Sequence, residues 1–130
     1  LAEMVRTVRG VPATADHVLV VRGSQMALDL CARVLVRPGD VVAVEALGYR
    51  PAWDALRLAG AELVAVPVDG DGLDVAALAR LADRRRVRAV YLTPHHQYPT
   101  TVTLTASRRM ALWKHTRSST TTGWTARSAG

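Results

Sequence analysis

Gly23, Ser24 and Gln25 stand where an apolar run gives way to a helical pattern. The run His17–Val21 is rich in β-branched residues and predicts a short buried strand. Residues 26–35 show apolar positions at helical spacing, with Ser24 placed as the N-cap. Free N–H groups at such a helix start, with the helix dipole, favour an anion the size of a phosphate. On this stretch alone a plain turn and cap is favoured, because the dinucleotide and P-loop glycine patterns are absent.

Two further loops carry side chains that could do chemistry. Tyr49 ends a short loop that follows the apolar run Val41–Glu45. His95, His96 and Gln97 lie in the loop 93–101 and offer imidazole and amide groups that could hydrogen-bond a ligand. Adjacent histidines without Asp or Glu nearby rarely form a metal site, so no metal ligands are assigned.

Strands and helices alternate along the chain on short connections. The expected strands are His17–Val21, Val41–Glu45, Glu62–Val66 and Arg88–Leu92, and the expected helices cover 1–8, 26–35, 52–59, 74–81 and 105–113. This order predicts an α/β fold, a mostly parallel sheet with helices on both faces. Ligands of such sheets gather at the carboxyl ends of the strands. The three candidate loops all follow strands, so Gly23–Gln25, Tyr49 and His96 are expected to converge.

Composition narrows the classes of protein. Nothing resembles a secretory signal or a span long enough for a bilayer, so a cytoplasmic protein is the default expectation. Cys31 is the single cysteine and is expected to be buried on the apolar face of its helix. The net charge of +6 invites nucleic acid binding, but residues 1–113 carry only +3. The arginines of 84–88 have no aromatic residues between them for base stacking, which argues against that function.

The loops side by side resemble a known family. The matching words are Gly23-Ser24-Gln25-Met26-Ala27-Leu28-Asp29-Leu30, Pro38-Gly39-Asp40-Val41-Val42, Glu45–Tyr49, Ala59-Gly60-Ala61, Val66-Pro67-Val68-Asp69, Gly72-Leu73, Tyr91-Leu-Thr-Pro-His-His-Gln-Tyr-Pro-Thr100 and Arg108-Arg109. They resemble the aminotransferase-like domain of MocR-type transcriptional regulators of the GntR family. The resemblance implies part of the large domain of the type I aminotransferase fold, with pyridoxal phosphate as cofactor.

The resemblance also implies roles for the loop residues. Gly23, Ser24 and Gln25 would hold the cofactor phosphate, and Tyr49 would stack on the pyridine ring, as a flat phenol can. His96 and Gln97 would lie near the phenolic oxygen of the cofactor. Two residues depart from the family pattern: Leu47 replaces a usual proline, which is expected to loosen the loop of Tyr49, and Thr101 replaces a frequent glycine.

The chemistry of this cofactor needs a lysine for covalent attachment and an acid opposite the pyridine nitrogen. The one lysine, Lys114, matches no family motif, and no aspartate follows Asp83. No residue is therefore assigned a catalytic role, and cofactor binding is expected to be weak or absent. We expect the chain to be a middle piece of such a protein, with residues 1–113 as the partial domain. Residues 114–130 are expected to be unstructured or translated from a shifted reading frame.

Three functions remain open from the sequence. The first is the part of a MocR-type regulator that senses a small amino compound, in a protein that is a homodimer and contacts DNA through a separate N-terminal domain. The second is a piece of a stand-alone class I/II aminotransferase, a transferase of amino groups. The third is a small basic nucleic-acid-binding protein, which the salt dependence of any such binding would test.

Overall fold

A parallel sheet of three strands forms the centre of the computed structural model, which describes residues 1–120 and side chains as far as Lys114. Strand β1 (Val41–Glu45) is central, and all five of its residues are buried. It pairs on one side with β2 (Glu62–Val66) and on the other with β5 (Val87–Tyr91). A continuous apolar run suits such a strand because both of its faces are covered.

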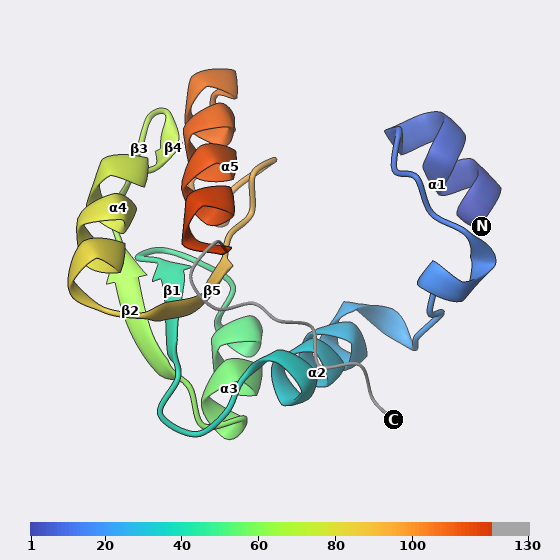
Figure 1. The fold of residues 1–130 in the computed structure, drawn as a ribbon, viewed down its shortest axis with the longest axis horizontal. Coiled ribbons are helices and arrows are strands. Elements are labelled where there is room, and N and C mark those ends of the chain that lie inside the picture. Colours follow the sequence, from blue (N-terminus) through green and yellow to red (C-terminus); the bar gives the residue numbers. More distant parts are fainter. Residues whose placement is uncertain (121–130) are drawn as a thin grey trace.

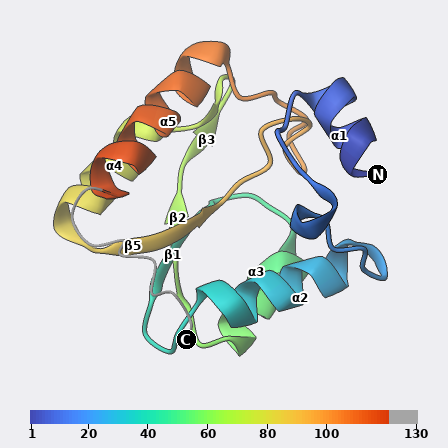
Figure 2. The same ribbon diagram turned by 45° about the vertical axis from the view of Figure 1, so that its right-hand side comes forward.

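Helices cover both faces of this sheet, and alternate residues of β1 divide the core between them (Figure 1). Val42 and Val44 face α3 (Arg50–Leu58), against which α2 (Gly23–Leu35) packs. Ala43 faces α4 (Val75–Arg84) and α5 (Ala106–Thr120). Figure 2 shows the two helix pairs on opposite sides of the strands. Successive side chains of a strand point to opposite faces, and this one strand therefore serves two clusters.

Shorter elements complete the described chain. Strands β3 (Val68–Asp69) and β4 (Gly72–Leu73) form an antiparallel hairpin between β2 and α4. Helix α1 (Ala2–Arg9) and the 3₁₀ turn η1 (Ala15–His17) precede α2. Helix α1 buries no residue and lies apart from the sheet in Figure 1.

The expected strand His17–Val21 is wrong. His17 ends the 3₁₀ turn, and the next residues have no regular structure. Leu19 and Val20 are 78% and 71% exposed. A strand requires a partner that satisfies its backbone groups and covers its side chains, and no strand of residues 1–120 pairs with this run. The expected sheet of four strands therefore has three.

Most helix ends agree with the sequence signals, but the start of α2 and the exposure of Cys31 differ. Gly10 ends α1 in the left-handed conformation, and Oδ1 of Asp74 accepts a hydrogen bond from Ala77 N (3.0 Å) at the start of α4. Ser24 is not the N-cap, because α2 begins at Gly23 and its N-cap residue is Arg22. The expectation that Cys31 is buried is wrong: Cys31 is exposed, and the buried residue of α2 is its neighbour Ala32.

The last helix also extends further than expected. Helix α5 continues past Trp113 to Thr120, so the described part of the expected unstructured tail is helical. Residues 114–120 contain neither Gly nor Pro, so no helix-breaking residue ends the helix at Trp113. Residues 121–130 of that tail lie outside the described residues. Within the described chain, no helix is long and apolar enough to cross a membrane.

Candidate functional site

The loops that follow β1 and β5 are joined at the carboxyl ends of these neighbouring strands. Glu45, the last residue of β1, is 2% exposed. Its Oε2 accepts hydrogen bonds from the N–H (3.1 Å) and the hydroxyl (2.7 Å) of Thr93. A buried carboxylate is costly unless it is hydrogen-bonded, and Thr93 supplies two donors from the other loop. This contact fixes where both loops begin.

Gln97 makes a second connection between the same loops. Its side-chain N–H₂ group donates to the carbonyls of Leu47 and Tyr98, and its Oε1 accepts from the N–H and hydroxyl of Thr100. The residue is 1% exposed. The amide therefore faces the interior of the loops and is shielded from solvent. The expectation that Gln97 contacts a ligand stays a prediction.

The start of α2 is joined to the loop of Tyr49. Nε2 of Gln25 donates to the carbonyl of Pro51 (3.1 Å), two residues beyond Tyr49. Tyr49 is the N-cap residue of α3 and is 39% exposed. The structure thus brings the loops of Gly23–Gln25, Tyr49 and His96 to one side of the sheet. Their role in binding stays a prediction.

The helix start itself is open. No side chain caps α2, and Ser24 and Gln25 are exposed. Gly23 has φ +84°, and a Cβ at this position would meet no atom within 4 Å. Gly23 N donates to Val21 O (3.0 Å), so the N–H groups of Ser24 and Gln25 and the Ser24 hydroxyl are the ones available to an anion. These residues fit a phosphate group. Tyr49 lies in the loop that Gln25 contacts, so its ring could stack on a ring attached to that phosphate.

His96 occupies a strained position on the third loop. His96 has φ +51°, and Thr101 has φ +60°. Left-handed conformations of residues other than glycine cost about 1–3 kcal/mol each, more for a β-branched residue such as threonine. The imidazole of His96 is exposed. Strain of this kind persists only where the surrounding structure enforces it, and the bonds of Gln97 supply that enforcement.

Arginines at the start of α5 hold the other end of this loop. Arg109 donates to the carbonyls of Leu104 (2.9 Å) and Pro94 (3.1 Å), and its guanidinium lies beside both ring nitrogens of His95. Arg108 forms a two-pronged pair with Asp69 at 2.7 Å. The hydrogen bonds from Arg108 hold the pKa of Asp69 below its usual value. Both arginines belong to the resembled motif. In this chain Arg108 connects α5 to Asp69, and Arg109 connects α5 to the loop of His95.

The pKa of Tyr91 reflects its burial and the charges near it. This residue ends β5, and burial, followed by the nearby charges of Glu45 and Tyr49, raises the pKa of its phenol. Its hydroxyl therefore stays protonated at neutral pH and above.

Glu45, Thr93 and Arg109 were not predicted as parts of the site. A carboxylate that ends an otherwise apolar strand was the signal available for Glu45. Its partner, 48 residues away, could not be identified from the sequence. Arg109 belongs to the resembled motif, but the resemblance assigns it no role.

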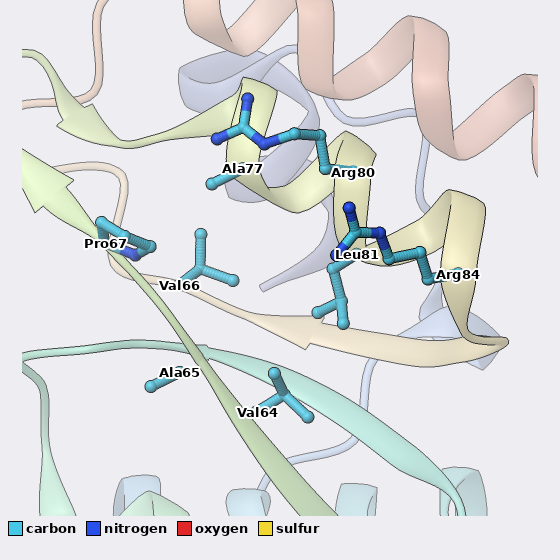
Figure 3. A pocket seen from close by; sticks show the side chains of 8 residues that line it. All are labelled: Val64, Ala65, Val66, Pro67, Ala77, Arg80, Leu81 and Arg84. Carbon is cyan, nitrogen blue, oxygen red and sulfur yellow. The ribbon is translucent and has the colours of Figure 1, made fainter.

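A cavity of about 300 Å³ lies elsewhere, between the outer edge of β2 and α4 (Figure 3). Its lining comes from residues 64–67 and from Ala77, Arg80, Leu81 and Arg84 of α4. None of the predicted site residues contributes to it. Among the described residues, no group of His, Cys, Asp and Glu could hold a metal ion.

Comparison with known proteins identifies the family. The model of aminotransferase class I and II matches residues 1–117, and the chain belongs to this family. An archaeal alanine:glyoxylate aminotransferase structure superposes with a TM-score of 0.83 at 30% identity, over 91% of this chain and 30% of that one. The fold is therefore the type I aminotransferase fold, and the family depends on pyridoxal phosphate.

Two curated relatives represent two kinds of protein. Aromatic-amino-acid aminotransferase 1 of Thermococcus litoralis is 35% identical over 86% of this chain and 28% of its own length. The probable rhizopine catabolism regulatory protein MocR of Rhizobium meliloti is 40% identical over 76% of this chain and 19% of its own length. The chain thus spans less than a third of either relative, and its family includes both enzymes and regulators.

Proposed function

We propose that this chain supplies the phosphate-binding and ring-stacking part of a pyridoxal phosphate-binding domain, in a MocR-type regulator that senses an amino compound. The observation that carries the proposal is the junction of three loops at one side of the sheet, beside an uncapped helix start. Ser24 and the N–H groups of the first turn of α2 hold the phosphate, and Tyr49 stacks on the ring. His96 donates a hydrogen bond toward the phenolic oxygen.

Covalent attachment is not assigned to this chain. Pyridoxal phosphate withdraws electrons from a bound amino compound and, in the enzymes, is attached through a lysine. Lys114 lies on α5, eight residues and about 12 Å along the helix axis from Ala106. It is exposed. We therefore expect the chain to bind the cofactor weakly, through the anion site and stacking alone, and to have no transaminase activity.

The experiment is reduction of the mixture of chain and pyridoxal phosphate with borohydride, followed by mapping of modified lysine by mass spectrometry. The expected result is labelling of Lys114 no greater than in the Tyr49→Ala and Ser24→Ala variants. Strong labelling of Lys114 that both substitutions abolish would contradict the proposal, because it would show a working covalent site. Competition between inorganic phosphate and pyridoxal phosphate tests the anion site separately. Inorganic phosphate should displace the cofactor if both bind at the start of α2.

A stand-alone aminotransferase is the second candidate, and the similarity to the Thermococcus litoralis enzyme favours it. The discriminating observation is the DNA upstream of this coding sequence. A winged-helix domain in the same reading frame would support the regulator. An aminotransferase N-terminal segment in that frame, with turnover of an amino acid and a keto acid by the whole protein, would support the enzyme.

The domain boundary is also a proposal. Ala111 and Leu112 of α5 pack against the core, and Trp113 is 59% exposed. We propose that residues 1–113 form the packed part of the domain and that the segment 114–130, although helical as far as Thr120, contributes nothing to the site. Trypsin is expected to cleave after Arg117 and Arg127 before it cleaves the rest of the chain. If these two bonds are protected from trypsin as well as the bonds of residues 1–113, the proposed boundary is contradicted.

A further inference from the structure

Two buried polar side chains stand out among those that the structure describes. Glu45 and Gln97 are 2% and 1% exposed, and the other fully buried side chains of the core are apolar. Both join the loop after β1 to the loop after β5. A buried polar group that does not shape the core can instead fix one arrangement of the segments that it connects.

The hydrogen-bonding groups of Gln97 are used within the chain. Its backbone N–H donates to Val102 O (3.0 Å), and its carbonyl accepts from Thr101 N (2.6 Å). Its side-chain N–H₂ group faces two carbonyls, those of Leu47 and Tyr98, and its oxygen faces the two donors of Thr100. A flipped amide would place its oxygen against both carbonyls, so the orientation is determined. No donor of this side chain is left for a ligand.

The loop that Gln97 holds is the one that carries Tyr49, and it is fixed at successive residues. Ala46 N donates to Val66 O (2.8 Å), and the carbonyl of Leu47 accepts from Gln97. At Gly48 the backbone lies against the ring of Trp53, so that a Cβ would be 3.0 Å from Cζ2. The leucine in place of the usual proline therefore does not leave this loop untied.

We propose that Gln97 is a positioning residue, which holds the loop of Tyr49 in the conformation that receives the cofactor ring and does not itself touch the cofactor. This proposal rests on the proposed function. Tyr49 is two residues from the carbonyl that Gln97 holds and is 39% exposed, so a shift of the loop backbone would move its ring. Ligand affinity falls in proportion to the fraction of molecules in the competent conformation.

Hydrogen exchange of the chain without ligand tests the positioning directly. In the Gln97→Ala variant, amide exchange in residues 46–50 is expected to rise about tenfold, because the closed conformation loses its tie. Gln97→Glu should give the same increase, since a carboxylate oxygen would face two carbonyls. Gly48→Ala should give it by a different route, because its Cβ displaces the loop from Trp53 while Gln97 is intact.

The matched control is Leu78→Ala, a core substitution on α4, away from these loops. The variants are compared at temperatures where their global stability is equal. An increase in residues 46–50 in Gln97→Ala that Leu78→Ala does not show supports the proposal. An equal increase in both would overturn it, because Gln97 would then contribute only general stability.

Affinity for pyridoxal phosphate separates the two proposals. A drop of about tenfold that accompanies faster exchange in residues 46–50 supports positioning. Loss of binding with unchanged exchange would overturn it, because Gln97 would then contact the cofactor. If the unaltered chain binds no pyridoxal phosphate although the exchange pattern holds, positioning of the loop is supported and the proposed function fails.

Discussion

Two segments that lead into the candidate site differ in how they are held. Residues 11–25 reach the start of α2 with exposed apolar side chains at Leu19 and Val20, and Gln25 ties them to α3 by one hydrogen bond. The loops after β1 and β5 are tied by Glu45 and Gln97, which are both buried. Residues 11–25 have the stronger apolar pattern, but their apolar run 18–21 forms no regular structure. Hydrophobic patterning therefore yields a strand only where a partner covers it, whereas buried hydrogen bonds can order a loop without such a pattern.

The largest effect is expected at Glu45. Replacement by Ala leaves the N–H and hydroxyl of Thr93 without an acceptor and should lower the free energy of unfolding by about 2–3 kcal/mol. Chemical denaturation followed by circular dichroism measures this. Glu45→Gln is the control, because its amide oxygen can accept from the same two donors. A loss of equal size in both variants would mean that these hydrogen bonds are not the source of the effect.

Thr101→Gly is expected to stabilise the chain by about 1 kcal/mol, because glycine adopts φ +60° without the strain of a β-branched residue. The gain is reduced by the greater freedom of glycine in the unfolded chain. Thr100→Gly is the matched control and should destabilise, since it removes the hydroxyl that donates to Gln97. Destabilisation by Thr101→Gly would show that its left-handed backbone carries no strain.

Acid should weaken the anchor at the start of α5. Arg108 lowers the pKa of Asp69 below its ordinary value of 3.8. The stabilisation is therefore complete above that ordinary value and is lost as the pH falls through the lower, folded value. Thermal unfolding between pH 5 and pH 2 should be less pH-dependent in Arg108→Gln, with Arg108→Lys intermediate, because lysine keeps the charge without the two-pronged geometry. An unchanged profile in Arg108→Gln would contradict the pairing.

The smallest effect is expected in residues 11–25, whose apolar run has no strand partner among the described residues. Leu19→Ser and Val20→Ser should change the free energy of unfolding by less than about 0.5 kcal/mol, because both side chains are already exposed. Denaturant titration checks this beside Glu45→Ala. A loss of more than 1 kcal/mol would show that the segment is packed in solution, and the contrast between the two segments would then disappear.

Much of the fold could be predicted from local signals. The bounds of β1 and β2 and the cap at Asp74 follow from apolar runs and turn residues. The order of strands and helices placed the loops of Tyr49 and His96 at the carboxyl ends of neighbouring strands. The wrong strand at His17–Val21 and the unforeseen hydrogen bonds of Gln97 have one cause. Segments far along the chain decide whether a run is paired and which carbonyl an amide meets. No described strand pairs with residues 17–21, and the Leu47 carbonyl lies 50 residues before Gln97.

The most direct test of the account is hydrogen exchange of the chain with and without saturating pyridoxal phosphate. With the cofactor bound, we expect slower exchange in the first turn of α2, in residues 46–50 and around His96. We expect no change in α1 or at the cavity between β2 and α4. Protection confined to the cavity, or no protection in the three loops at saturation, would contradict the claim that these loops form the cofactor site.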